Sequence, residues 1–242
     1  MALSNAAFRE KFRAFKRSAW KPVTEPGPAG LLDSKYAGIP WLGMQESYPV
    51  CGTCKEPLQL FLQLNIAQLP AEAKNLLGFE EGLLQLFYCT QKSCESQSEG
   101  EPFSNNHLIR IVPGTTLLHS APESAQPGIA SLPEKKIVGW TAFDDFPSMD
   151  EEIELPELSE DDEDAYYLSE PYLTASGDKL GGWPAWVQEQ EYPECPECRE
   201  LMQLVYQIDS YAELKWSFGD IGTGHITQCA EHRHVLAFGW SS

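Results

Sequence analysis

SKYAGIPWLGMQESYPVCGTCKEPLQLFLQLN at residues 34–65 and DKLGGWPAWVQEQEYPECPECRELMQLVYQID at residues 178–209 align without a gap. The two stretches lie 144 residues apart, and 11 of their 32 aligned positions are identical. Each contains a Cys-x-x-Cys motif that precedes an apolar run interrupted by Gln. This agreement predicts an internal duplication, in which two equivalent β units pack as one pseudo-symmetric body.

The cysteines of the chain fall into two matching sets. Each Cys-x-x-Cys pair is followed, at the end of a later apolar run, by a second pair with four residues between its members. The resulting sets are Cys51, Cys54, Cys89 and Cys94 in the first half, and Cys195, Cys198, Cys229 and His234 in the second. The match to Cys94 favours His234, and His232 is the alternative. Because zinc is held tetrahedrally by Cys and His, we expect two structural zinc sites.

Catalytic chemistry fits this pattern poorly. A zinc ion with four protein ligands has no open position for water or substrate. The sequence also lacks the nucleophile-elbow, phosphate-loop and H-E-x-x-H motifs. A thioredoxin-like motif would follow a strand and open a helix, whereas both motifs here precede strand-like runs. We therefore expect no enzymatic activity. The alternative is an enzyme with a cleft between the halves, lined by Gln63, Gln207, Trp183 and Asp220.

The charge of the chain indicates which partners it can attract. The 242 residues include 36 acidic and 17 basic side chains, for a net charge of −19. Such a field repels nucleic acids and anionic membranes and attracts basic proteins. No apolar run is long enough to span a membrane, and no apolar signal region follows the basic N-terminus. We therefore expect a cytoplasmic protein with a basic protein client.

Four segments are expected along the chain. Phe8, Phe12, Phe15 and Ala19 recur at helical spacing, which predicts an amphipathic helix over residues 1–21 that packs its Phe face on the body. A membrane-surface or partner-binding helix is the alternative. The first half then spans residues 31–143, and the second spans 171–242. Residues 144–170 form an acidic linker between them, with a docking strip for a basic partner as the sharper interpretation.

Alternating or continuous apolar runs predict the strands, and hence an α+β fold rich in antiparallel strand. The expected strands cover residues 58–66, 83–89, 107–112 and 136–143 in the first half, and 201–208, 224–229 and 234–240 in the second. Each half alone has too few strands for an independent core. We therefore expect the two halves to share one sheet or to pack face to face.

Several segments resemble a known family. They are residues 34–42, 57–65, 82–88, 139–140, 144–147 and 219–222. Together they resemble the bacterial YwqG-like DUF1963 family over residues 20–240, a family without settled activity. Leu180–Trp186, the Cys-Pro-x-Cys at 195–198 and Met202–Tyr206 also resemble the C-terminal domain of programmed-cell-death-2 proteins. Eukaryotic members of that group are thought to chaperone a basic ribosomal protein. The resemblance thus implies a chaperone role. Together with the acidic charge and the closed metal sets, we expect a protein-binding module that holds or masks a basic client, as a chaperone or a toxin-immunity protein.

Overall fold

The fold is one antiparallel sheet in this computed structural model, which describes residues 5–95, 100–117, 132–148, 151–159, 161–162 and 174–242. The described strands follow the order β10-β9-β8-β7-β1-β6-β2-β3-β4-β5. They are β1 (Arg17–Pro26), β2 (Lys35–Tyr36), β3 (Gln59–Asn65), β4 (Gly82–Tyr88), β5 (His107–Pro113), β6 (Lys135–Asp145), β7 (Lys179–Gly181), β8 (Gln203–Asp209), β9 (Thr223–Gln228) and β10 (Leu236–Ser241). Helices are few: α1 (Asn5–Lys11), α2 (Ala71–Leu77) and 3-10 turns at Arg13–Phe15, Ile66–Gln68 and Gly114–Thr116. The expected wealth of antiparallel strand is confirmed.

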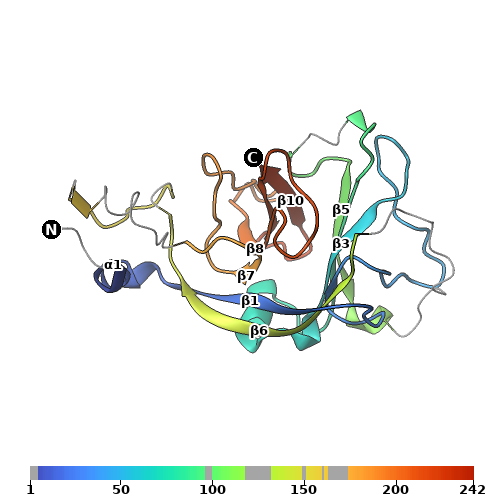
Figure 1. Cartoon of the computed structure of the whole chain (residues 1–242), viewed down its shortest axis with the longest axis horizontal. Coiled ribbons are helices and arrows are strands. Elements are labelled where there is room, and N and C mark those ends of the chain that lie inside the picture. Colours follow the sequence, from blue (N-terminus) through green and yellow to red (C-terminus); the bar gives the residue numbers. More distant parts are fainter. Residues whose placement is uncertain (1–4, 96–99, 118–131, 149–150, 160, 163–173) are drawn as a thin grey trace.

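A long ribbon of two strands, β1 and β6, forms the middle of the sheet (Figure 1). On the side away from β6, β1 pairs with β7 of the second half, where Trp20 lies opposite Leu180. On the side away from β1, β6 pairs with β2 of the first half, where Lys35 lies opposite Lys136. By chain order, β1 leads into the first half and β6 into the second. Each half therefore borders the strand that leads into the other half.

The curved sheet brings its two edge strands together and encloses one main core. In β4 every side chain is buried, and in β3 all but the last. At the sheet's far edges, the His107 ring of β5 lies 5.5 Å from the Phe238 ring of β10. Deep inside, the hydroxyls of Tyr36 and Tyr206 are hydrogen-bonded at 2.5 Å. The core thus takes side chains from both halves, and burial of each large apolar side chain contributes about 1.5–3 kcal/mol.

The aligned stretches occupy corresponding places in the sheet. β2 pairs with β3 so that Lys35 lies opposite Gln63, and β7 pairs with β8 so that Lys179 lies opposite Gln207. The register between β3 and β4 shifts between Leu60 and Leu62, and the register between β8 and β9 shifts at the aligned positions, between Leu204 and Tyr206. Each Gln side chain bridges two loops beside its short strand: Gln63 joins Trp41 to Asp33, and Gln207 joins Ala185 to Gly177. Corresponding positions in the two halves therefore make the same strand pairings and the same kinds of hydrogen bond.

The N-terminal segment differs from the helix expected over residues 1–21. Helix α1 ends at Lys11, and residues from Arg17 onward form β1. Pro22 excludes a continued helix, and pairing along the whole of β6 satisfies the backbone of this segment as strand. The Phe face is buried, as predicted, but its partner differs: Phe8 and Phe12 pack against Phe146, which belongs to the segment expected to be the acidic linker.

The described parts of the acidic segment pack against the body. Phe146 lies in the cluster under α1, and its carbonyl accepts a hydrogen bond from Thr174 Oγ1 at 2.7 Å. Glu151 is buried and accepts from Trp186 Nε1 at 2.9 Å, whereas Glu152, Glu154 and Glu157 are exposed. Residues 149–150, 160 and 163–173 of the expected linker lie outside the described residues.

Candidate metal centres

Each Cys-x-x-Cys motif forms the same tight turn. The Cys51 amide donates to the Glu56 carbonyl at 2.8 Å, and the Lys55 amide donates back to the Cys51 carbonyl at 3.0 Å. Cys195, Glu200 and Arg199 make the same two bonds at 2.9 and 2.8 Å. Lys55 and Arg199 both adopt a left-handed conformation, with φ of 65° and 68°. The turn points both cysteines of a pair to the same side, which is what a shared ion requires.

The first candidate centre brings together the four cysteines predicted from the sequence. Cys51, Cys89 and Cys94 are buried, and Cys54 is partly buried. The Cys51 and Cys94 sulfurs lie 3.8 Å apart, and those of Cys54 and Cys89 lie 3.7 Å apart. All four sulfurs lie within 4.8 Å of one another. β4 delivers Cys89, whose amide bonds the Asn106 carbonyl at 2.8 Å.

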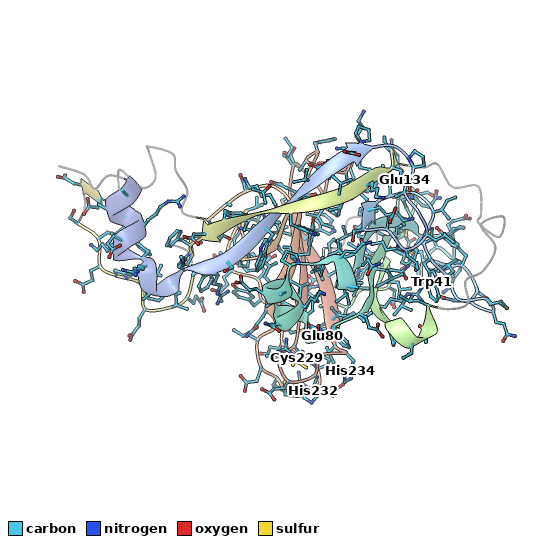
Figure 2. All side chains as sticks on the ribbon, turned by 90° about the horizontal axis from the view of Figure 1, so that it is seen from below. Trp41, Glu80, Glu134, Cys229, His232 and His234 are labelled. Carbon is cyan, nitrogen blue, oxygen red and sulfur yellow. The ribbon has the colours of Figure 1, made fainter. Side chains whose placement is uncertain are left out.

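The second candidate centre takes His232 as its fourth member. Cys198 and Cys229 have sulfurs 3.6 Å apart, and His232 Nδ1 lies 3.8 Å from the sulfurs of both Cys195 and Cys229. Cys229 and His232 lie close together at the lower edge of the view in Figure 2. The structure differs here from the preference for His234, whose side chain is 72% exposed and whose Nε2 lies 2.7 Å from Glu197. The turn from β9 to β10 is tight, and it directs the nearer histidine toward the sulfurs.

The dimensions of both groups fit a tetrahedral ion. With metal–sulfur distances of about 2.3 Å, the sulfurs of a tetrahedral thiolate site lie about 3.8 Å apart. The observed separations of 3.6–3.8 Å match this edge length. A disulfide needs sulfurs at about 2.05 Å, so none of these pairs is bonded. Two separate groups of four ligands could therefore each hold a metal ion.

The electrostatics of the cysteines favour a bound cation. Burial raises the pKa of the Cys89 thiol well above its usual range, and the neighbouring Cys54 and Cys51 thiols raise it further. Without a positive charge, four adjacent thiolates would repel one another. Backbone N–H groups of Glu56, Gln91, Glu200 and Glu231 hydrogen-bond the sulfurs of Cys54, Cys89, Cys198 and Cys229 respectively. Those N–H groups and a bound ion would together hold the deprotonated form.

None of the four residues of the alternative enzyme cleft lines the pockets found among the described residues. Gln63 and Gln207 are fully buried, and their side-chain amides hydrogen-bond the backbone of neighbouring loops. Trp183 is buried, donates from Nε1 to the Phe15 carbonyl and stacks under the Arg17 guanidinium. Asp220 is exposed in a turn. The described contacts of these four side chains are structural.

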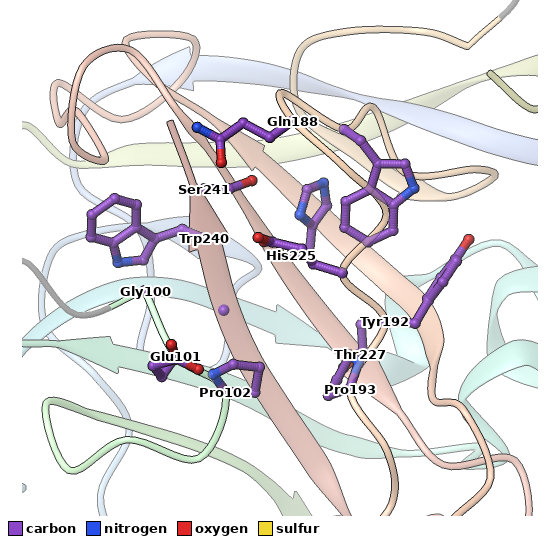
Figure 3. Close-up of a pocket in the computed structure, with 13 residues that line it drawn as sticks. Gly100, Glu101, Pro102, Gln188, Tyr192, Pro193, His225, Thr227, Trp240 and Ser241 are labelled. Carbon is purple, nitrogen blue, oxygen red and sulfur yellow. The ribbon is translucent and has the colours of Figure 1, made fainter. Parts of the chain in front are cut away.

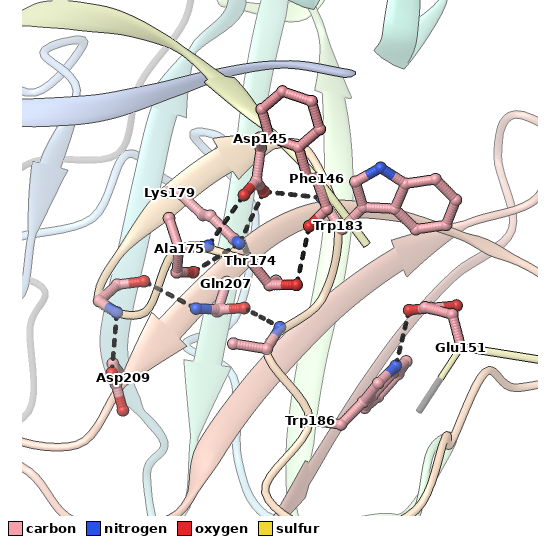
Figure 4. A network of polar contacts seen from close by, with 12 residues as sticks. Asp145, Phe146, Glu151, Thr174, Ala175, Lys179, Trp183, Trp186, Gln207 and Asp209 are labelled. Carbon is pink, nitrogen blue, oxygen red and sulfur yellow. Dashed lines mark hydrogen bonds and ion pairs between the residues drawn. The ribbon is translucent and has the colours of Figure 1, made fainter. Parts of the chain in front are cut away.

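A buried ion pair was missed by the sequence interpretation. Lys179 Nζ lies 2.8 Å from Asp145 Oδ2, and both side chains are completely buried (Figure 4). Asp145 also accepts from the amides of Ala175 and Trp183. In the first half, the corresponding Lys35 is equally buried and donates to the Gly30 carbonyl. The identity of Lys35 and Lys179 in the two aligned stretches was the available signal.

Comparison with protein families places the chain. A family model described as a domain of unknown function, DUF1963, matches residues 34–231. The chain belongs to the DUF1963 family. The matched part of this DUF1963 protein includes all seven cysteines and stops just before His232. No curated protein matched the chain. The likeness of the second half to programmed-cell-death-2 proteins stays a prediction. Among the residues that the structure describes, no helix is long and apolar enough to cross a membrane.

Proposed function

We propose that this DUF1963 protein is a non-enzymatic binding module, stapled by two zinc ions, that holds or masks a basic client protein. The observation that carries the proposal is the net charge of −19, displayed on a fold whose candidate metal groups are complete. Burial does not remove this excess: two lysines (Lys35 and Lys179) and four acidic side chains (Asp145, Glu151, Asp162 and Asp178) are buried, so most of the acidic side chains stay accessible. A cytoplasmic setting suits free thiols that hold metal.

Zinc is the proposed ion in both groups. Tetrahedral sets of four cysteines, or of three cysteines and a histidine, select zinc or iron–sulfur chemistry. The ligands would be Cys51, Cys54, Cys89 and Cys94 in one group and Cys195, Cys198, Cys229 and His232 in the other. A closed set leaves no position for substrate, so the role of the ion is to stabilise the fold.

Internal duplication is proposed for the two halves. The support is the agreement between corresponding places: the Cys turns, the bulges in β3 and β8, and the Gln bridges at Gln63 and Gln207. Bulges and left-handed residues at equal positions are specific features, because a one-residue slip would reverse every side chain of a strand.

The client surface is proposed to include the exposed acidic side chains after β6. Glu151 anchors this segment on Trp186 and Tyr192, so Glu152, Glu154 and Glu157 are presented at a fixed place. Anchored charge attracts a basic partner without the full entropic cost of ordering a free tail.

Capture from a native extract with the purified full chain tests the proposal. The test variant replaces Glu152, Glu154 and Glu157 with Gln, and the matched control replaces the exposed Glu72, Glu80 and Glu95, so that both carry the same net charge. We expect a basic protein that is retained at low salt, released at high salt and lost from the test variant alone. Equal capture by both variants, or a client that is acidic, would contradict the proposal.

A further inference from the structure

A pocket of about 420 Å³ opens in the second half (Figure 3). Its floor is formed by β9 and β10, and one wall is the loop that leads into the second Cys turn. Trp240 lies on one side of His225 and Tyr192 on the other. The pocket is separate from the candidate metal groups, because none of their eight ligands lines it.

Three polar atoms in the pocket lining are buried and have no hydrogen-bond partner among the residues that the structure describes. They are His225 Nε2, Thr227 Oγ1 and Ser241 Oγ. Their residues are only 5%, 2% and 7% exposed. Buried polar atoms are nearly always paired in folded proteins, and each unpaired one is costly. Three such atoms in one lining indicate a polar ligand, to which the two hydroxyls can donate or accept.

His225 is arranged to accept a hydrogen bond. Its other ring nitrogen bonds the backbone of Ala185, whose amide is already committed to Gln207 Oε1, so the bond is to the Ala185 carbonyl. That bond places the proton on Nδ1 and leaves a lone pair on Nε2. Burial and, secondarily, the nearby Lys179 charge lower the pKa of His225 to about 3, so the ring stays neutral.

Aromatic and acidic groups complete the pocket. The Trp186 indole and the Tyr192 hydroxyl donate to the buried Glu151 carboxylate, and the Trp240 indole donates to Tyr88 Oη at 2.9 Å. Their polar atoms are thereby occupied, which leaves the aromatic rings as a fixed lining. Glu101 and Glu191 are exposed at the rim. Aromatic rings and carboxylates around buried acceptors favour a cation.

The corresponding place in the first half contains an arginine. Gln85 lies opposite Gln63 just as His225 lies opposite Gln207, so the two positions correspond. On the next strand, Gln85 faces Arg110, whereas His225 faces Gly239.

Arg110 shows how that place binds a guanidinium. Its Nε donates to Gln85 Oε1 at 2.9 Å, its NH1 pairs with Glu46, and it lies over the Phe87 ring at 5.8 Å. The first half therefore fills the place with its own side chain: an acceptor, a carboxylate and an aromatic ring surround one guanidinium. The second half keeps the same three kinds of group and has glycine where the arginine would start.

We propose that the pocket of the second half binds an arginine side chain supplied by the client protein. This deepens the proposed function and rests on it, since the arginine belongs to the basic client. His225 Nε2 and Thr227 Oγ1, two residues apart on the same face of β9, accept from the guanidinium, and Glu101 and Glu191 balance its charge.

Titration of the isotope-labelled full chain with N-acetyl-arginine methylamide tests this by NMR. A lone side chain is small, so millimolar affinity is expected. The Trp240 indole signal should shift, and the Arg110 Nε signal should not. The citrulline analogue, which has the same shape without the charge, should bind at least tenfold more weakly, and the lysine analogue should also bind more weakly. Equal binding of either analogue, or an unmoved Trp240 signal, would overturn the proposal.

Two variants locate the binding. Thr227→Val keeps the volume and removes one acceptor, so it should weaken the arginine analogue about tenfold. Glu191→Gln at the rim should weaken it about two- to fivefold, and the exposed Glu189→Gln is its matched control without effect. If the fully folded Thr227→Val variant binds the arginine analogue as tightly as the parent chain does, the assignment is overturned.

The client assay separates this inference from the proposed function. If Thr227→Val captures the client as well as the parent chain does, while the Glu152, Glu154 and Glu157 variant loses it, the pocket assignment fails and the proposed function stands. If the arginine analogue binds and no basic client is captured, the proposed function fails and the arginine site stands.

Discussion

Replacing Asp178 with Asn should make the protein more stable at alkaline pH. Asp178 is buried beside the Tyr36–Tyr206 pair, where its Oδ1 accepts from the Asp209 amide at 2.7 Å. Its Oδ2 has no hydrogen-bond partner among the described residues. In the first half, the hydroxyl of the corresponding Ser34 accepts from the Asn65 amide at 2.9 Å. The position therefore needs an acceptor and gains nothing from a charge.

The size of the effect follows from the pKa of Asp178. Burial raises it from 3.8 to about 7, helped by the negative charges of Glu213 and Asp209, and the Asp209 amide and Tyr36 hydroxyl offset part of the rise. The folded state thus keeps the proton to a higher pH than the unfolded state does. The stability from this group is complete below about pH 4 and is lost as pH rises through about 7. The whole loss is about 4 kcal/mol, at 1.36 kcal/mol per pH unit.

Urea unfolding of the parent chain and of Asp178→Asn, at pH 6 and at pH 8.5, measures this. Between these pH values the advantage of the variant should grow by about 1.4 kcal/mol, because the parent loses the rest of its protonated fraction. Any pH dependence of metal binding cancels, since it affects both proteins equally. The exposed Asp220→Asn is the control and should show no such growth. An advantage that stays constant or shrinks with pH would refute the reasoning.

Three further predictions concern the candidate centres and the buried pair. Cys51→Ser and Cys195→Ser should each destabilise the chain by several kcal/mol in the zinc-loaded form, and chelation should abolish that difference in melting temperature, because ligand energy is folding energy. His232→Ala should reduce the metal content from two ions to one by elemental analysis, whereas a loss with His234→Ala alone would restore the sequence-based preference. Lys179→Met should cost about 3–5 kcal/mol in urea unfolding because it strands the buried Asp145 charge, whereas Lys136→Met, which breaks a partly exposed pair with Asp33, should cost at most about 1 kcal/mol.

Sequence reasoning found seven of the ten described strands and seven of the eight residues of the candidate metal groups, and the latter for a physical reason. Cysteine is rare, and ions need fixed ligand numbers, so counting seven cysteines into two sets left few arrangements. The choice between His232 and His234 failed to follow from counting. In the first half, Cys89 and Cys94 lie in a long loop between β4 and β5. In the second half, Cys229 and the two histidines lie in a short turn between β9 and β10, so equal spacing does not give equal geometry.

Other features depend on contacts that no local pattern carries. The helical spacing of apolar side chains that starts at Phe8 runs on to Ala19, which lies in β1, and the strand conformation of β1 is set by β6, more than 100 residues later. The pocket depends on Gly239 lying opposite His225 in the sheet, and both residues lie beyond the aligned stretches. Arg110 and Gly239 could be equated only after the pairing of β5 and β10 was known.

The exchange of leading strands has a consequence for synthesis on the ribosome. β1 emerges early, but its partner β7 follows about 160 residues later, which at about 5–20 residues per second is a wait of roughly 10–30 s. During that wait, the edge of β1 is open to other nascent chains. Lys21 and Pro22 lie on this strand, and a charge and a missing amide both discourage foreign pairing. Neither half can close its sheet alone, so a truncated chain would expose the same edge permanently.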